Sequence, residues 1–229
     1  MTGVLHLSPR AAHQLWAPFY DETPNAVLAL EERVVRPMLS QTAGLHTLDL
    51  ACGTGRWMQE LRCRGAKTVV GLDFSREMLS QARRKDSLAR SLVEADATEI
   101  PLQSHSMDFA ICSFGLSYVA ELPLVARELS RVLTTNGHFI VSDFHPSALA
   151  RGWKRAFRHG DSVVEISSFG RPLNEIHETF IREGFSSVLC FEPEFDETEK
   201  PIFEKCGKGA LFSRMLGQPV LFVTVFRRS

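Results

Sequence analysis

Short β-type runs alternate with helix-type segments through the middle of this 229-residue chain. The runs are short and apolar, several of them rich in Val, Ile or Phe, and the segments between them place apolar residues at helical spacing. This alternation predicts a parallel sheet with helices on both faces. The expected strands span Leu45–Asp49, Thr68–Asp73, Leu92–Ala95, Asp108–Ser113 and Gly137–Asp143, and the expected helices Arg56–Cys63, Ser75–Lys85 and Pro123–Leu133.

Further elements are expected on both sides of this core. Pro24–Leu39 carries a broad apolar stripe and predicts a packed helix. In folds of this kind the last two strands often form a hairpin with one antiparallel member. We therefore expect an α/β, Rossmann-like, seven-stranded, mostly parallel sheet whose last strand is antiparallel. After the core we expect a basic helix over Ser147–His159, an extra strand Val163–Ile166, a helix Pro172–Glu183, strands Val188–Phe195 and Val220–Phe226, and a turn-rich link Lys205–Pro219 between those two strands.

Composition narrows the class of protein. With 26 basic and 27 acidic side chains the net charge is -1, so no overall positive field would draw the chain onto nucleic acid or anionic lipid. The five cysteines are odd in number and lack CxxC spacing, so we expect neither a disulfide framework nor a metal site. No stretch has the length of a signal-peptide core or a membrane span. We expect a cytoplasmic protein with no nucleic-acid or membrane partner.

The run LDLACGTG, from Leu48 to Gly55, follows the first expected core strand. Its small residues Ala51, Gly53 and Gly55 let the backbone turn sharply and approach a ligand. The dinucleotide fingerprint GxGxxG would need a third glycine, but Met58 stands at that position, which weakens the interpretation as an NAD site.

Two acidic residues follow the next strands. Asp73 ends the second expected strand, where a carboxylate can accept both hydrogen bonds of a ribose diol. Asp96 and Ala97 follow the third, where a short acceptor can bind the adenine amine and alanine leaves room for the ring. These positions favour a nucleoside-bearing ligand.

Five segments in order carry a family resemblance: LDLACGTG, GLDFSREML, EADATEIPL, SMDFAICSFGLSYV and RELSRVLTTNGHFIVSDF. Together they resemble the small-molecule class I methyltransferases that use S-adenosylmethionine, including those of ubiquinone and menaquinone biosynthesis. The resemblance covers Trp16 to Phe144. It implies a single methyltransferase domain over 1–229, with N-terminal lid helices in 1–44, a cofactor-binding core in 45–144, and a substrate-side insertion with closing strands in 145–229.

The resemblance also implies roles for individual residues. Asp49, Gly53 and Gly55 would surround the methionine moiety, and Ser113 would reach its end from the fourth strand. Ala51 stands where many members carry glycine, which is tolerable if its φ stays below zero. Tyr20 would close over the cofactor carboxylate as part of a lid. The adenosine would lie among Asp73 at the ribose, Phe74 and Met78 along the adenine and ribose, and Asp96 and Ala97 at the adenine; core packing is an equal explanation for Phe74 and Met78.

Methyl transfer from a sulfonium requires alignment, exclusion of water and, for oxygen or carbon acceptors, removal of a proton. His145 follows the fifth expected core strand, at the edge where ligands of doubly wound folds bind, and is the candidate general base. A structural role as a cap of the turn at Pro146 is equally compatible. Asp143 is a second candidate, and His105 is expected in a solvent-exposed loop.

The segment Ala150–Gly160 gathers basic side chains around Trp153 and Phe157. A solvated helix face explains it most simply. Our hypothesis is that it receives an anionic group of a small-molecule acceptor, either free or on a carrier protein, for methylation at oxygen, carbon or nitrogen. Two other functions remain open: a cofactor-binding subunit without turnover, and an NAD-dependent oxidoreductase. For an RNA methyltransferase we find neither an added RNA-binding module nor the asparagine-proline-proline-aromatic motif, since SFGL stands in its place.

Overall fold

The computed structural model describes residues 3–85 and 88–229. Its main sheet has seven strands in the order β4-β3-β2-β5-β6-β10-β9. Strands β2 to β6 run parallel to one another, and β10 is antiparallel to both β6 and β9, which confirms the expected fold class. The strands span β2 His46–Leu50, β3 Thr68–Asp73, β4 Leu92–Glu94, β5 Met107–Ser113, β6 Leu133–Phe144, β9 Phe185–Phe191 and β10 Leu221–Arg228.

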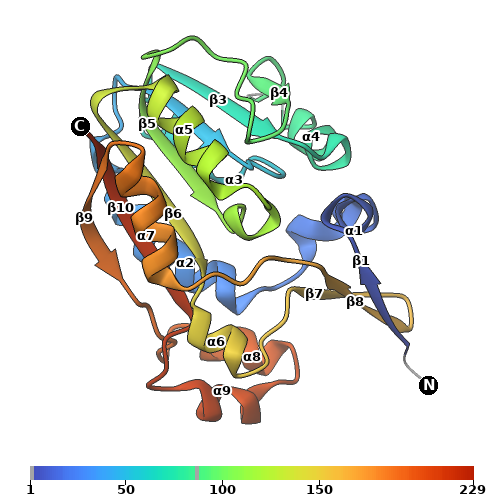
Figure 1. Cartoon of the computed structure of the whole chain (residues 1–229). Helices are drawn as coiled ribbons and strands as arrows, with labels where there is room; N and C mark the ends of the chain where they lie inside the picture. The colour runs from blue at the N-terminus through green and yellow to red at the C-terminus, as the bar shows by residue number, and fades with distance from the viewer. Residues whose placement is uncertain (1–2, 86–87) are drawn as a thin grey trace.

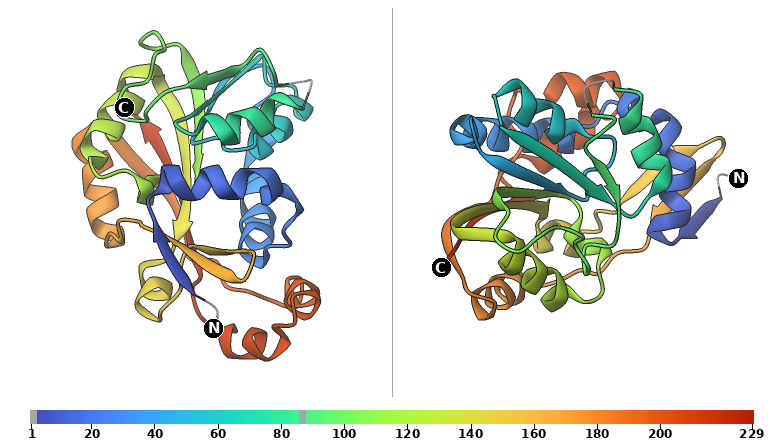
Figure 2. Two further views of the ribbon diagram at one scale, coloured as in Figure 1. Left: turned by 90° about the vertical axis from the view of Figure 1, so that its right-hand side faces the viewer. Right: turned by 90° about the horizontal axis from the view of Figure 1, so that it is seen from above.

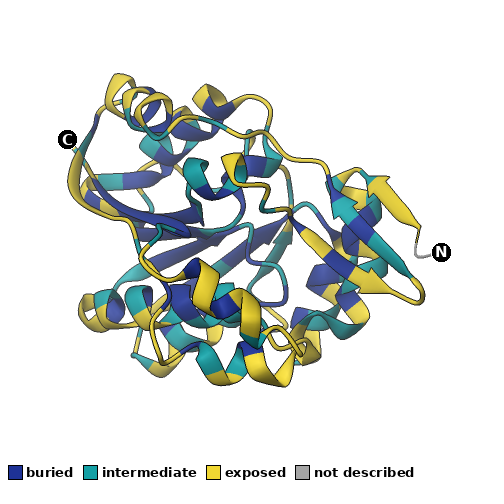
Figure 3. Cartoon of the chain, turned by 90° about the horizontal axis from the view of Figure 1, so that it is seen from below, coloured by how far each residue is buried: buried dark blue, intermediate teal, exposed yellow. Residues whose placement is uncertain are grey.

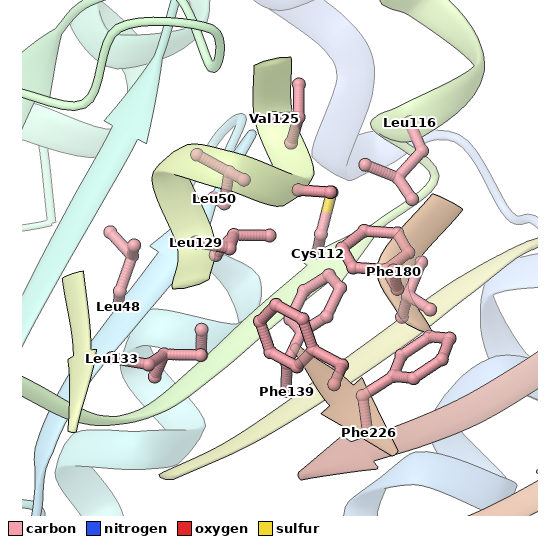
Figure 4. Packing of buried hydrophobic residues seen from close by; sticks show 14 of the residues in the cluster. Leu48, Leu50, Cys112, Leu116, Val125, Leu129, Leu133, Phe139, Phe180 and Phe226 are labelled. Carbon is pink, nitrogen blue, oxygen red and sulfur yellow. The ribbon is translucent and has the colours of Figure 1, made fainter. Parts of the chain in front are cut away.

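Helices cover both faces of this sheet (Figures 1 and 2). Helices α5 (Leu122–Val132) and α7 (Leu173–Arg182) pack on one face, where Phe139, Phe180 and Phe226 form the centre of an aromatic core (Figure 4). The other face packs against α2 (Ala26–Met38), α3 (Arg56–Cys63) and α4 (Arg76–Arg83). The middle strands are therefore buried between two layers, as Figure 3 shows.

A second sheet of three strands lies beside the main one, in the order β1-β8-β7. It joins β1 (Val4–Leu7) to β7 (Ala156–His159) and β8 (Ser162–Ile166), so the start of the chain pairs with a segment about 160 residues away in sequence. The expected extra strand over Val163–Ile166 is present, but in this small sheet. Helix α1 (Pro9–Trp16) and the 3-10 turn η1 (Ala17–Glu22) follow β1 and pack on the small sheet through Ala12, Trp16 and Phe19.

The expected basic helix over Ser147–His159 is wrong. Helix α6 spans only Pro146–Ala150; Gly152 then takes a φ of +91°, and the chain enters β7. Phe157 is buried against Trp16, with ring centroids 4.7 Å apart, and this contact favours a strand over a solvated helix. Tertiary packing overrides the local charge pattern here.

The link before the last strand also differs from the expectation. Helix α9 (Gly209–Met215) replaces part of the turn-rich segment, and α8 (Lys200–Lys205) ends where that segment begins. Phe203, Phe212 and Met215 of these helices are buried in one cluster with Leu30 of α2. Strand β9 begins three residues before the expected Val188 and ends at Phe191.

Two further 3-10 turns, η2 and η3, span Leu39–Gln41 and Leu116–Tyr118. No helix in the described part of the chain is both long enough and apolar enough to span a bilayer.

Candidate active site

The loop after β2 turns on residues with positive φ. Gly53 and Gly55 have φ of +55° and +83°, and Ala51 has φ +58°, so the condition of a negative φ, under which alanine would be tolerable here, is not met. A left-handed alanine costs about 1–2 kcal/mol. Gly115, after β5, gives the alanine methyl its space: a Cβ at Gly115 would lie 2.5 Å from that of Ala51. The alanine therefore fits because a neighbouring residue lacks a side chain.

Asp73 anchors this loop from the end of β3. Its two carboxylate oxygens accept hydrogen bonds from the backbone N–H of Gly53 at 2.8 Å and of Ser75 at 2.8 Å. Burial raises the pKa of Asp73 to about 6, against the lowering effect of these two hydrogen bonds. The carboxylate thus fixes the loop, and its remaining lone pairs are available to a ligand.

Asp49 lies at the end of β2 and is buried, with 1% of its surface exposed. Its Oδ2 has no hydrogen-bond partner among the described residues. Burial, with the charges of Asp73 and Glu31, raises the pKa of Asp49 to about 8, while Arg56 opposes the shift. An acceptor oxygen buried without a partner is unfavourable unless a donor arrives, so this position suits the ammonium group of a ligand.

A cavity of about 1190 Å³ lies at the carboxyl ends of these strands. Asp49 and Gly55 are not among its lining residues, and neither is His145. We call one side of this cavity the cofactor half. It is lined by the other residues that the sequence singles out in the loop and near the strand ends. The cavity brings together Tyr20, Ala51, Gly53, Asp73, Phe74, Met78, Asp96, Ala97 and Ser113.

The 3-10 turn η1 is tied to the loop after β2 through Asp21. Its carboxylate accepts a hydrogen bond from Thr54 Oγ1 at 2.6 Å and pairs with Lys85 Nζ at 2.9 Å. Tyr20 beside it lines the cavity, packs on Trp16 with ring centroids 4.6 Å apart, and has its pKa raised to about 12 by burial. The segment therefore covers the cavity on the side of the loop.

A buried charge network near this loop was not expected from the sequence. Glu31 of α2 is fully buried and pairs with Arg56 at the start of α3. Glu31 also accepts a hydrogen bond from Ser142 Oγ, and Arg56 donates to Ser113 Oγ at 3.3 Å. The network joins α2 and α3 to the ends of β5 and β6. A charged residue inside the apolar stripe of α2 was the available signal.

The opposite side of the cavity, the acceptor half, comes from segments far apart in sequence. Arg155 pairs with the buried Asp143 at the end of β6 and lies over the rings of Tyr118 and Phe144, at 5.0 and 4.8 Å from their centroids. His13 of α1 packs edge-on against Tyr118 at 5.3 Å between centroids. No local sequence signal marks His13. The other lining residues of the acceptor half include Trp16, Phe19, Phe114, Glu121, Trp153, Lys154, Phe157, Arg158, Ile202, Phe203, Lys208 and Leu211.

His145 caps the short helix α6. Its Nδ1 accepts a hydrogen bond from the Ser147 backbone N–H at 3.2 Å, and its Nε2 lies 3.4 Å from a carboxylate oxygen of Glu192. The capping role that the sequence left open for this residue is present. His105, in turn, has φ +54° and directs Nδ1 to the Leu133 carbonyl at 3.2 Å.

The cofactor half fits an adenosyl ligand with an amino-acid end. A Cβ at Gly53 would meet no atom within 4 Å, so the backbone there is open to close approach. Asp73, Asp96 and Ala97 line this half, and Asp49, which does not line it, has a buried oxygen without a partner among the described residues. The fold and this site define a Rossmann-like domain of the nucleoside-binding kind.

Comparisons with known proteins agree with this class. Residues 48–141 match a family model described as a methyltransferase domain. The chain is 31% identical over 153 residues to the biotin biosynthesis bifunctional protein BioHC of Cellvibrio japonicus, covering 67% of this chain and 30% of that protein. It is 32% identical over 126 residues to the demethylmenaquinone methyltransferase of Staphylococcus aureus, covering 52% of each. The chain thus spans about half or less of the length of these two relatives.

A solved structure supports the fold. The S-adenosylmethionine-dependent methyltransferase of Mesorhizobium loti aligns with a TM-score of 0.67 and 24% identity, over 89% of this chain and 100% of that one. The chain therefore carries a methyltransferase domain, in a fold shared with this S-adenosylmethionine-dependent enzyme.

Proposed function

We propose that this protein transfers a methyl group from S-adenosylmethionine to a small-molecule acceptor that carries an anionic group. One cavity carries the proposal. Residues of the methyltransferase motifs line one side of it, and the basic and aromatic residues of the acceptor half line the other. The relative named demethylmenaquinone methyltransferase, whose name gives a small molecule as acceptor, supports the small-molecule class.

The cofactor half would hold S-adenosylmethionine through the residues that the motifs single out. Asp73 would bind the ribose, Phe74 and Met78 would line the adenosine, and Asp96 and Ala97 would contact the adenine. Asp49 would receive the ammonium group, with Gly53, Gly55, Ala51, Ser113 and Tyr20 around the methionine moiety. When bound, the sulfonium supplies an electrophilic methyl group, so the chain itself has to orient the acceptor and exclude water.

The charges of the acceptor half support an anionic acceptor. Arg158 and Lys208 line it and have no ion-pair partner among the described residues, while Lys154 lies 3.5 Å from Glu165. Outside the cofactor half, Glu121 is the one carboxylate in the described lining. The surrounding walls are aromatic, so the acceptor would combine a negative group with an apolar body. An acceptor on a carrier protein would present the same chemistry.

Charge reversal tests the acceptor half. Arg155 is not suitable for charge reversal because its side chain is buried and paired with Asp143. The informative variants are therefore Arg158→Glu and Lys208→Glu. We expect a KM for the acceptor raised about tenfold or more, with an unchanged affinity for S-adenosylhomocysteine. Arg214→Glu, on α9 outside the lining, is the matched control.

The measurement combines calorimetry with transfer of labelled methyl groups. S-Adenosylhomocysteine should bind and NAD should not. A panel of hydroxylated carboxylates and phosphate esters should reveal an acceptor. Binding without any methylated product would instead favour a cofactor-binding subunit without turnover, and binding of NAD alone would favour an oxidoreductase.

A further inference from the structure

His13 lies between the two halves of the cavity. Its imidazole lines the cavity with 8% of the residue exposed. The ring centroid is 5.6 Å from that of Phe74, which follows the ribose-side Asp73, and 5.3 Å from that of Tyr118 in the acceptor half. A group at this position is close to both ligands of a methyl transfer.

Arg155 lies on the same tyrosine as His13. Its guanidinium carbon is 5.0 Å from the Tyr118 ring centroid, and its positive charge acts on His13. Asp143 pairs with one of its terminal nitrogens, whereas Nε is buried without a partner among the described residues. The guanidinium therefore retains a donor for an additional acceptor atom.

His13 is held in its neutral form. Burial is the main cause that lowers the pKa of His13 to about 4; Arg155 adds to it and Glu77 opposes it. Arg10 of the same helix lies over the neighbouring Phe74 ring and brings a further positive charge to this region. Nδ1 of His13 is buried without a partner among the described residues. At neutral pH the imidazole thus has a free lone pair and does not repel a cationic ligand.

We propose that His13 and Arg155 form the site where the acceptor is deprotonated: the His13 imidazole takes the proton of an oxygen acid, a hydroxyl or an enol, and Arg155 binds the oxyanion. The proposal rests on the proposed function and names a base for it. The O–H proton moves to a ring nitrogen of His13, the oxygen keeps the bonding electron pair, and the imidazolium later returns the proton to solvent.

The pair of groups selects the chemistry of the acceptor. A guanidinium in contact with a hydroxyl favours its ionised form and lowers its pKa, which brings the hydroxyl closer to the weakly basic His13. An amine acceptor gains nothing from this arrangement, because methylation of a neutral amine places a positive charge on its nitrogen, and the buried Arg155 disfavours that charge. The site therefore favours methylation at oxygen, or at the carbon of an enolate, over methylation at nitrogen.

The test uses the full chain and 4-nitrophenol, whose ionised form is coloured and loses its colour on O-methylation. In the complex with S-adenosylhomocysteine we expect the pKa of bound 4-nitrophenol to fall below that of the free phenol. Asp143→Asn/Arg155→Met should abolish this fall. This double variant removes both charges, so no carboxylate is left buried alone.

His13→Gln tests the base. With S-adenosylmethionine we expect its rate of 4-nitrophenol methylation to fall about 100-fold at a pH where the free phenol is protonated. The rate should return to near that of the unchanged protein at a pH where the phenol is already ionised, and the affinity for S-adenosylhomocysteine should not change. The matched control is His138→Gln. His138 lies on β6 with much of its surface exposed, and partial burial together with Arg227 lowers its pKa as well.

Four results would overturn the proposal. Two concern the rate of His13→Gln: a loss that is equal at every pH, or no change. The third is that 4-nitrophenol fails to bind with a lowered pKa, and the fourth is a pH-dependent loss in His145→Gln in place of His13→Gln. Failure of the unchanged protein to bind S-adenosylhomocysteine would instead contradict the proposed function, so the two failures are distinguishable.

Discussion

The two halves of the cavity are assembled in different ways. Apart from Tyr20, the cofactor half comes from one stretch of chain, Ala51 to Ser113. Its residues lie at or just after the ends of parallel strands, except Met78, which lies on the following helix α4. The acceptor half combines α1, η1, the segment after α6 and the helices α8 and α9. The carboxyl ends of parallel strands meet by the rules of the fold, whereas distant segments meet only through their packing.

The halves also differ in what holds their polar groups. In the cofactor half, Asp73 is fixed by backbone N–H groups of its own loop and helix. In the acceptor half, Arg155 is fixed by the side chain of Asp143 and by aromatic rings from other elements. Side-chain substitutions can therefore change the acceptor half while leaving the cofactor half intact. The predictions below test this separation.

The largest expected effect concerns the buried pair that lies under the cofactor loop. Arg56→Met leaves Glu31 buried and without its cation, which should lower the free energy of unfolding by about 3–5 kcal/mol. Equilibrium unfolding in urea measures it. Glu31→Leu/Arg56→Met removes both charges and should recover part of the loss; an Arg56→Met variant as stable as the unchanged protein would show that the pair does not support the loop.

A smaller effect is expected at Asp73. Asp73→Asn replaces one carboxylate oxygen by an N–H₂ group that faces a backbone N–H, either that of Gly53 or that of Ser75. Hydrogen bonds to a charged group contribute about 1.5–3 kcal/mol each, so losing the one to the ribose should weaken binding of S-adenosylhomocysteine about 10- to 100-fold. Calorimetry measures the affinity. Asp161→Asn, an exposed residue between β7 and β8, should bind like the unchanged protein, and equal affinities for both variants would contradict the assigned role.

The same division explains how far the sequence could predict the structure. The expected range of β3 agrees with the observed strand to the residue, and that of α3 does too, because hydrophobic periodicity and the glycine loop act locally. Most of the residues singled out around that loop line one cavity for the same reason. Their roles in binding stay predictions.

Outside the core, non-local contacts decide the structure. The charges of Ala150–Gly160 favour a helix, but stacking of Phe157 on Trp16 and pairing of β7 with β8 place residues 156–159 in a strand. His13 could not be singled out, because its neighbours Phe74 and Tyr118 lie 61 and 105 residues further along the chain. Side chains that meet across such separations leave no spacing pattern in a single sequence.

The smallest expected effect lies at Ala51, whose methyl group occupies the space that a side chain at Gly115 would need. Ala51→Gly relieves a left-handed alanine that costs about 1–2 kcal/mol, but glycine loses about 0.5–1 kcal/mol more on folding, so the free energy of unfolding should rise by about 0–1.5 kcal/mol. Ala29→Gly, inside helix α2, should instead lower stability by about 1 kcal/mol. Urea unfolding compares the two variants, and a loss at Ala51 as large as that at Ala29 would mean that the methyl group packs well enough to outweigh its backbone strain.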